Sequence, residues 1–213
     1  MTNPLIITGT DTGIGKTIFA AGLTAALQAR YWKPVQSGLE EETDSQIVAR
    51  LTGHPTLPEA YRLHLPASPH LSAEAEGTSI DPARLTLPAG DGPLVIEGAG
   101  GLMVPLNRQM LMIDLFARWQ APVILCARTA LGTINHSLLS LAALRQAGCP
   151  ILGIAFVGTH NPAVEQTICD FGQVVHLGCL PILPHLTSAS LQAAFKDSID
   201  LATIRKGLGL DPA

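Results

Sequence analysis

Residues 9–17 read Gly9-Thr10-Asp11-Thr12-Gly13-Ile14-Gly15-Lys16-Thr17. They follow a short apolar run and open a long apolar segment, so we expect a strand before them and a helix after them. Glycines at such a turn let backbone N–H groups approach phosphate oxygens closely, and the start of the helix adds partial positive charge. The pattern predicts a P-loop, with Lys16 at the β- and γ-phosphates and the Thr17 hydroxyl on Mg²⁺.

This stretch departs from the usual P-loop spacing in one respect. Five residues, instead of four, separate Gly9 from Gly15, and Thr10 stands where a glycine is usual. A glycine-rich turn between strand and helix, with no phosphate, is the alternative interpretation. The stretch lacks GxGxxG, which argues against a dinucleotide site of the Rossmann type.

The rest of the chain alternates apolar, β-branched runs with helical patterns. Strands are predicted over residues 5–8, 31–35, 93–97, 122–127, 151–157 and 174–180, and helices over 16–29, 44–51, 113–119, 133–146 and 163–171. Parallel strands that are buried on both faces are hydrophobic throughout, as these runs are. We therefore expect an α/β fold, a three-layer P-loop NTPase with a mostly parallel central sheet and helices on both faces.

Length and composition favour one compact domain. The chain has 213 residues, of which 47% are hydrophobic and 14% charged, so we expect a single domain over 1–213 with a large buried core. A net charge of -4 provides no basic field for nucleic acid or an anionic membrane. There is no apolar stretch of membrane-spanning length and no basic, apolar leader at the N-terminus, so we expect a cytoplasmic protein.

Residues 54–93 interrupt the alternation. They hold seven of the sixteen prolines. Loops of this length in compact domains are usually functional or disordered. Because apolar side chains such as Leu63, Leu65 and Leu71 occur within it, we expect an ordered loop or lid.

The cysteines and histidines show no metal-binding spacing. Cys126, Cys149, Cys169 and Cys179 are far apart and lack the paired cysteines or neighbouring histidines of a zinc site. The seven histidines form no HExxH motif or close pair. We expect reduced, partly buried thiols and no zinc site.

Two further polar residues, Glu97 and Lys33, fall where a parallel sheet binds its ligand, at the carboxyl ends of strands. Glu97 ends an apolar run, and Lys33 lies inside another, which is costly unless its ammonium finds an anion such as phosphate. Asp44 opens a predicted helix. By itself, Glu97 could be a helix cap or a strand-end ion pair, and Asp44 could simply favour its first turn. Beside Thr17, both carboxylates are predicted ligands of Mg²⁺.

At this point the chain resembles a known family. Five stretches occur in the order found in dethiobiotin synthetases, namely residues 9–17 with their Thr-Asp-Thr centre, Lys33-Pro34-Val35-Gln36-Ser37-Gly38, Ser68-Pro69-His70, Glu97-Gly98-Ala99-Gly100-Gly101, and Leu131-Gly132-Thr133-Ile134-Asn135-His136. The resemblance covers roughly residues 5–185. It implies a cytoplasmic homodimer that converts 7,8-diaminopelargonate, CO2 or bicarbonate, and ATP to dethiobiotin, ADP and phosphate, with Mg²⁺ as cofactor.

The resemblance also implies roles for individual residues. Lys16 and Lys33 are expected to act on the γ-phosphate and on a carbamate formed from the substrate. The expected nucleotide contacts are Gly13, Ile14, Gly15, Lys16, Thr17, Ile18, Asp44, Glu97, Gly98, Ala99, Gly100, Pro181, Ile182 and Leu183. The expected substrate contacts are Thr12, Ser37, Gly132, Thr133 and Asn135, and the expected metal ligands are Thr17, Asp44 and Glu97.

Residues 132–135 are expected to act across a dimer interface. They open a helix, and its free N–H groups suit the carboxylate at the far end of the substrate. The resemblance places this helix start at the interface, facing the partner's site. An ordinary helix capped by Thr133 or Asn135 is the alternative. His136 is a candidate for the interface and His70 for the lid near the substrate.

The base of the nucleotide has no obvious side-chain partner. Family members commonly carry Asn-Asp after the strand predicted at 151–157, where this chain has Val157 and Gly158. We expect backbone groups around Pro181-Ile182-Leu183 to contact the base, and loose selectivity for ATP over GTP or CTP.

Two other functions fit part of the pattern. A nucleotide-dependent switch or partitioning ATPase would turn ATP over slowly, stimulated by a partner or DNA. The absence of basic charge, and Asp11 at a position where such relatives often carry lysine, argue against it. A cobyrinate-type amide synthase would need a glutaminase domain, for which this chain is too short.

Overall fold

The computed structural model describes residues 2–210, and its centre is a parallel β-sheet. The sheet has seven strands in the order β4-β2-β6-β1-β7-β8-β9, and every neighbouring pair is parallel. Its strands are β1 (Thr2–Gly9), β2 (Arg30–Trp32), β4 (Thr56–Leu57), β6 (Gly92–Gly101), β7 (Val123–Arg128), β8 (Ile151–Val157) and β9 (His176–Leu180). Strand β1 lies between β6 and β7, so the turn that follows it opens at the middle of the sheet.

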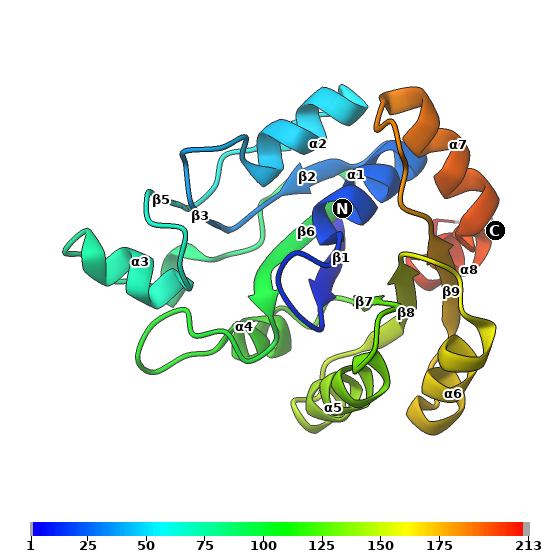
Figure 1. Ribbon diagram of the computed structural model, residues 1–213. Helices are drawn as coiled ribbons and strands as arrows, with labels where there is room; N and C mark the ends of the chain where they lie inside the picture. The colour runs from blue at the N-terminus through cyan, green and yellow to red at the C-terminus, as the bar shows by residue number, and fades with distance from the viewer. Residues whose placement is uncertain (1, 211–213) are drawn as a thin grey trace.

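Helices cover both faces of this sheet (Figure 1). One face carries α1 (Lys16–Leu27), α2 (Asp44–Thr52), α7 (Ser188–Ser198) and α8 (Leu201–Gly207). The other face carries α4 (Met112–Trp119), α5 (Thr133–Gln146) and α6 (Pro162–Gly172). The three-layer α/β fold predicted from the sequence is confirmed.

The core follows from the alternation of side chains along the buried strands. In β1, Leu5 and Ile7 pack against α1, whereas Ile6 points to the layer that contains α4. All three side chains are at most 1% exposed. Both faces of the central strands are therefore dry, as expected of parallel strands between two layers of helices.

The predicted strand over residues 31–35 is wrong, because two short strands in different sheets replace it. Strand β2 ends at Trp32, and β3 (Val35–Ser37) pairs in parallel with β5 (Tyr61–Leu63) in a separate two-stranded sheet. Pro34, which has no N–H, stands between them. Its carbonyl accepts from the backbone N–H groups of Ala60 and Tyr61. The chain thus leaves the central sheet at Lys33.

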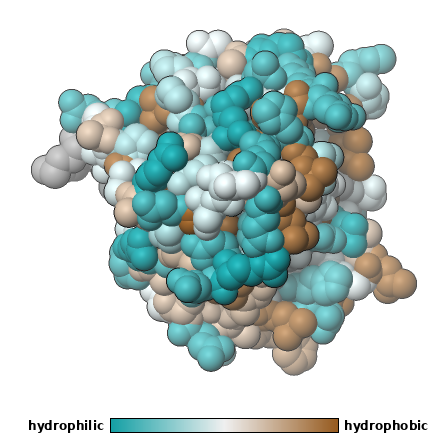
Figure 2. Space-filling view, turned by 90° about the vertical axis from the view of Figure 1, so that its left-hand side faces the viewer, coloured by the Kyte–Doolittle hydropathy of each residue, from teal (hydrophilic) through white to brown (hydrophobic). Residues whose placement is uncertain are grey.

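Residues 54–93 are ordered but are not one loop. They contain β4, β5, α3 (Pro69–Ala75), a 3-10 turn η1 (Pro82–Arg84) and the start of β6. Leu63 is buried, whereas Leu65 and Leu71 are 44% and 45% exposed. Figure 2 looks onto the side of the molecule that carries α3, where hydrophilic side chains cover much of the surface and separate apolar groups lie among them.

Further differences concern the ends of two predicted elements and the presence of two helices that were not predicted. Strand β6 continues beyond Glu97 to Gly101, and helix α1 ends at Leu27 because Gln28 adopts a left-handed conformation. Helices α7 and α8 lie in a part of the sequence for which no element was predicted. Within residues 2–210, no helix combines the length and the hydropathy needed to cross a membrane.

Candidate active site

The turn after β1 has the backbone of an anion-binding loop. Gly13 and Gly15 have φ of 69° and 94°, which residues with a Cβ rarely adopt. A Cβ on Gly15 would also lie 2.7 Å from Cγ1 of Val157. Gly15 caps α1 without any side-chain hydrogen bond, so the first N–H groups of the helix remain available. These donors and the helix dipole attract phosphate.

Lys16 lies folded over this loop. Its Nζ donates to the backbone carbonyl of Asp11 at 2.6 Å, and its side chain is buried. Burial lowers the pKa of Lys16, against the opposing effect of the Glu97 carboxylate. A buried ammonium with only a carbonyl partner is prepared to bind an anion, because a phosphate oxygen is a stronger acceptor.

Three oxygen atoms that could serve as metal ligands, each from a different element, lie close together in front of the loop. The Thr17 hydroxyl lies 2.8 Å from Oδ1 of Asp44 and 2.9 Å from Oε1 of Glu97. Thr17 belongs to α1, Asp44 begins α2, and Glu97 lies in β6. A hydroxyl has one proton and ionised carboxylates only accept, so Thr17 cannot donate to both at once.

This arrangement fits Mg²⁺. Adjacent oxygens of an octahedral magnesium ion are about 2.9 Å apart when each lies about 2.0–2.1 Å from the metal. The two measured separations, 2.8 and 2.9 Å, match that spacing. Two carboxylates and a hydroxyl are also hard oxygen donors of the kind that magnesium prefers.

Lys33 reaches the same point from the neighbouring strand. Tyr31 and Trp32 pair with Val95 and Ile96, so the next residue, Lys33, arrives level with Glu97. Its Nζ lies 2.6 Å from Oδ2 of Asp44 and 3.0 Å from Oε1 of Glu97. Burial alone would lower the pKa of Lys33, but the two carboxylates outweigh it and hold that pKa above its ordinary value.

Tyr31 is a site residue that sequence reasoning missed. Its hydroxyl donates to Oε2 of Glu97 at 2.8 Å, and its side chain is fully buried. Burial and the nearby Glu97 raise the pKa of Tyr31 well above its ordinary value, so the phenol stays a donor. Tyr31 therefore fixes one oxygen of Glu97 and leaves the other toward Thr17 and Lys33.

Gln36 was also missed. Its side-chain carbonyl accepts from the backbone N–H of Asp44 at 3.3 Å, and its amide donates to the carbonyls of Ser37 and Gly38. Gln36 thus connects the end of β3 to the start of α2. The sequence offered one signal for each residue: Tyr31 is a polar group within an apolar run, and Gln36 belongs to the stretch 33–38 that carries the family resemblance.

A cavity of about 660 Å³ opens on this cluster. Its lining includes the predicted residues Thr12, Gly13, Gly15, Lys16, Thr17, Ile18, Lys33, Ser37, Asp44, Glu97, Ala99 and Gly100. Residues 66–69 of the proline-rich segment form another part of the wall. The Ser37 hydroxyl has no hydrogen-bond partner although the atom is buried. A polar ligand in the cavity would supply that partner.

A second cavity of about 690 Å³ lies on the other side of the P-loop. Both cavities share Gly13, Gly15 and Ile18, so a triphosphate on the loop would lie between them. The predicted base contacts Pro181, Ile182 and Leu183 line it, together with Ile14 and Val157. Its polar wall includes Thr159, His160 and Asn161, which sequence reasoning did not place there.

Some predicted residues lie outside both cavities. Gly98 lines neither cavity. Its Cα faces the Phe116 ring, which a Cβ at this position would contact. Its backbone carbonyl accepts a hydrogen bond from Nζ of Lys33. Gly132, Thr133 and Asn135 lie at the start of α5, also outside both linings.

The alternative of a capped helix at this position is wrong. Gly132 occupies the N-cap of α5 with φ of 92° and no side-chain cap hydrogen bond. The Thr133 hydroxyl pairs instead with Ser137.

The two histidine candidates also lie outside the cavity with the carboxylates. The ring of His70 contacts the Ser68 hydroxyl at 3.1 Å, and Ser68 lines that cavity whereas His70 does not. His136 is exposed on α5.

Several known proteins are similar in sequence to this chain over nearly its whole length. A family model described as an AAA domain matches residues 3–190. ATP-dependent dethiobiotin synthetase BioD of Rhodopseudomonas palustris (strain HaA2) is 57% identical over 216 residues, covering 100% of both chains. The protein of the same name from Agrobacterium fabrum (strain C58) is 63% identical over 200 residues, or 92% of this chain and 94% of the relative.

Solved structures with low identity share only the fold. Chloroplast FtsY from Physcomitrella patens has a TM-score of 0.52 at 14% identity, covering 90% of this chain and 64% of that one. A ParA family ATPase from Chlorobium tepidum has a TM-score of 0.50 at 9% identity, covering 96% and 95%. Given the P-loop, the carboxylate cluster and these full-length relatives, the chain belongs to the family of ATP-dependent dethiobiotin synthetases.

Proposed function

We infer that this chain is the biotin-biosynthetic ligase that makes dethiobiotin from 7,8-diaminopelargonate, CO2 and ATP, releasing ADP and phosphate. The observation that carries this inference is the position of one polar cluster, Thr17, Lys33, Asp44 and Glu97, at the mouth of the P-loop in a cavity large enough for a small substrate. Its close relatives bear the name of this activity.

The reaction needs positioned charges and no redox chemistry. One amine of the substrate adds to CO2 and loses a proton, which gives a carbamate. A carbamate oxygen then attacks the γ-phosphorus, and ADP leaves. The second amine attacks the carbonyl carbon of this carbamic-phosphoric anhydride and loses a proton, and phosphate leaves as the ureido ring closes. Phosphoryl transfer asks the protein mainly for orientation and stabilisation of charge.

The residues of the cluster suit these steps. Lys16 and the N–H groups of residues 13–18 hold the phosphates, and Lys33 holds the carbamate and the transferred phosphoryl group. An anion in the cavity competes with Asp44 and Glu97 for the N–H donors of Lys33. Thr17, Asp44 and Glu97 would hold Mg²⁺, which neutralises charge on the phosphate oxygens when bound. The Ser37 hydroxyl, buried without a partner, would bind the diamine or the carbamate.

We propose that two copies of the chain complete the substrate site. At the start of α5, which has no side-chain cap, the backbone N–H groups of Ile134 and Asn135 are available to the substrate carboxylate of the partner, whereas that of Thr133 donates to the carbonyl of Ala130. Apolar side chains near it are exposed in the single chain, with Leu131 103%, Leu139 62% and Ile134 37% exposed. A dimer would cover them.

Two smaller proposals concern the chain as a whole. A cytoplasmic location is supported by the four cysteines, which are all free. The role of a lid for residues 66–69 is supported by their place in the wall of the cavity.

Nucleotide selectivity is proposed to be loose. The cavity expected to hold the base is lined largely by apolar side chains, including Val157 and Leu183. Apolar walls accept the flat face of any base but do not read its edge. We expect kcat/KM for ATP, GTP and CTP to agree within about tenfold, or about 1.4 kcal/mol. Strict preference for ATP would mean that the base lies elsewhere.

Phosphate release is the assay that tests the function. The full chain is incubated with ATP and Mg²⁺, with and without diaminopelargonate plus bicarbonate, and dethiobiotin is identified by its mass. We expect release to depend strongly on the diamine, with one dethiobiotin formed per phosphate. Equal release in its absence would instead indicate an ATPase or a switch.

A further inference from the structure

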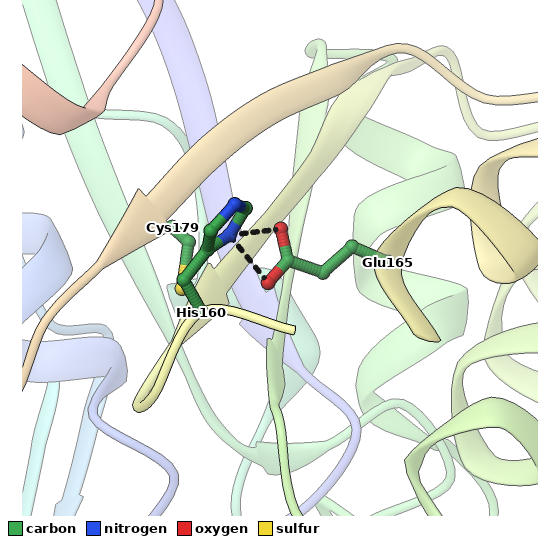
Figure 3. A group of neighbouring side chains, drawn as sticks. All are labelled: His160, Glu165 and Cys179. Atoms are coloured by element: carbon green, nitrogen blue, oxygen red, sulfur yellow. Dashed lines mark hydrogen bonds and ion pairs between the residues drawn. The ribbon is translucent and has the colours of Figure 1, made fainter. Parts of the chain in front are cut away.

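Three side chains of types that can bind a metal lie together at the polar wall of the second cavity, the one lined by Pro181, Ile182 and Leu183. A ring nitrogen of His160, a carboxylate oxygen of Glu165 and the Cys179 sulfur all lie within 4.8 Å of one another. Figure 3 shows the His160 ring facing the Glu165 carboxylate, with Cys179 beside them. The proposed reaction uses none of the three.

The three side chains come from α6, β9 and the segment that joins β8 to α6. Glu165 lies in the first turn of α6, and Cys179 lies in β9 opposite Phe156 of β8. His160 belongs to the segment 158–161, which joins β8 to α6 and lines the cavity. The N–H of Gly158 donates to the carbonyl of Leu180 at 3.0 Å, which ties this segment to the end of β9.

Glu165 is a buried carboxylate surrounded by donors. It is 1% exposed, and it accepts the backbone N–H of Asn161 at 2.7 Å. Nδ1 of His160 lies 2.9 and 3.0 Å from its two oxygens. A carboxylate so far from water needs a cation or several donors beside it.

A second histidine fixes the orientation of this carboxylate. Nε2 of His176 lies 2.8 Å from Oε2 of Glu165. Nδ1 of the same ring accepts the backbone N–H of Gly178 at 3.2 Å, so a neutral His176 carries its proton on Nε2 and donates it to Glu165. Partners of this kind, behind a metal ligand, orient it and strengthen metal binding.

We propose that His160, Glu165 and Cys179 bind one divalent ion of the zinc class, with a fourth position open to water. Nitrogen, oxygen and sulfur donors together suit zinc and its transition-metal neighbours, whereas magnesium takes oxygens alone. This site is thus chemically distinct from the cluster at the P-loop.

The fold, and not the spacing of the sequence, creates this site. Glu165 and Cys179 are 14 positions apart in the chain, so no short motif marks them. Ligand atoms of tetrahedral zinc lie about 3.3–3.6 Å apart, given bonds of about 2.0–2.1 Å to nitrogen and oxygen and about 2.3 Å to sulfur. Nδ1 of His160 is closer than this to the Glu165 carboxylate, but its side chain is 62% exposed, so the imidazole can move outward to the required spacing. The Cys179 sulfur lies within 4.8 Å of both other ligand atoms.

Cobalt(II) tests the proposal, because a thiolate bound to cobalt gives a charge-transfer band in the near ultraviolet that oxygen ligands do not give. The full chain, free of nucleotide and magnesium, is titrated with Co²⁺ under reducing conditions. We expect saturation at one thiolate-bound cobalt per chain. The result does not depend on the proposed enzymatic reaction, since neither ATP nor the diamine is present.

Matched variants assign the band to this site. Cys179→Ser should abolish it, whereas Cys149→Ser, which alters a buried thiol between α5 and β8, should leave it unchanged. His160→Ala removes an exposed side chain, so the fold is kept, and should weaken Co²⁺ binding at least about tenfold. A band missing from the unaltered chain, or retained in Cys179→Ser, overturns the proposal and leaves a hydrogen-bonded His–Glu cluster.

His176 provides a further check as a positioning residue. His176→Ala should weaken Co²⁺ binding about 10- to 100-fold. His176→Gln should restore much of the affinity, because its amide N–H can donate to the same oxygen of Glu165. Equal affinity in the alanine variant and the unaltered chain would refute this positioning role.

Discussion

Lys33 shows how one residue can organise a buried site. Asp44 and Glu97 both approach Thr17, and without a cation their like charges would repel in a region with little water. Lys33 lies within 3.0 Å of both carboxylates and supplies that charge. Its position follows from the register of β2 on β6, so the same backbone pairing that builds the sheet also places the lysine.

Replacing Lys33 tests its role in phosphoryl transfer. Lys33→Ala should lower kcat by about 10²–10³, or about 3–4 kcal/mol, as loss of other preorganised donors does. Steady-state kinetics with saturating diamine measures this. Lys196→Ala, at an exposed lysine in α7, is the control. Turnover near normal in Lys33→Ala would remove this residue from the mechanism.

Tyr31 should act through Glu97. Tyr31→Phe removes a buried hydrogen bond to a charged group, so the free energy of unfolding should fall by about 1.5–3 kcal/mol. The Mg²⁺ concentration for half-maximal activity should also rise, because Glu97 loses the donor that orients it. Tyr61→Phe is the matched control, since that hydroxyl accepts from the N–H of Asp81 away from the site. Unchanged magnesium dependence in Tyr31→Phe would contradict the positioning role.

Among the elements, the caps of the helices make separate contributions that can be measured. Asp200 caps α8, where Thr203 donates to it through its backbone N–H at 3.0 Å and its hydroxyl at 2.6 Å. The Thr203 hydroxyl and then its N–H hold the pKa of Asp200 below the ordinary value of 3.8. Helix α8 packs against β9, so this cap supports an edge of the central sheet.

The cap predicts a pH-dependent loss of stability. Asp200→Ala should lower the free energy of unfolding by about 1 kcal/mol at pH 7. Because the folded pKa is depressed, this contribution is present above the unfolded pKa of 3.8 and is lost as pH falls through the lower folded value. Urea unfolding of both proteins at pH 7 and near pH 3 measures it. A difference that grows toward pH 3 would contradict this account.

The sequence predicted the elements whose patterns are local. The P-loop, the strand–helix alternation and the helices from α1 to α6 other than α3 follow from apolar periodicity and glycine positions. Helix α7 was not predicted, although the sequence contains a local signal for it. Leu191, Ala194 and Phe195 share one face after the capping residue Thr187.

Features that depend on pairing at long range could not be predicted in this way. The division at Lys33 arises because β3 pairs with β5, which lies more than twenty residues further along the chain. Tyr31 reaches Glu97 only because β2 and β6 are neighbours in the sheet. The cluster at Glu165 likewise exists only in the folded chain. Thr17, Asp44 and Glu97 were predictable as a group because each lies at a carboxyl end of the sheet or beside the P-loop.

At the scale of the whole molecule, the positive charge available to a phosphate is confined to a few local groups. The net charge of -4 would repel a triphosphate at long range, so the proposed nucleotide binding would depend on the loop, on Lys16 and Lys33, and on the proposed Mg²⁺. The two cavities lie on either side of the P-loop and share Gly13, Gly15 and Ile18. In the proposed function, one cavity would hold the nucleotide base and the other the diamine.

The proposed dimer predicts that loss of the interface raises KM for the diamine more than KM for ATP. Leu139→Asp, on the exposed side of α5, should give a monomer in sedimentation analysis. It should also raise KM for the diamine at least about tenfold, or about 1.4 kcal/mol, with a smaller change in KM for ATP. Phe171→Asp, at another exposed apolar side chain, is the control. A monomer with full activity would refute the shared site.

Equilibrium binding of ATP to the full chain, with and without Mg²⁺, tests the central claim most directly, namely that the glycine turn before α1 holds a triphosphate beside a magnesium ion. Calorimetry should show one nucleotide per chain, tighter with Mg²⁺, and the gain from Mg²⁺ should be lost in Thr17→Ala. No affinity for any nucleoside triphosphate in the presence of Mg²⁺ would contradict the account.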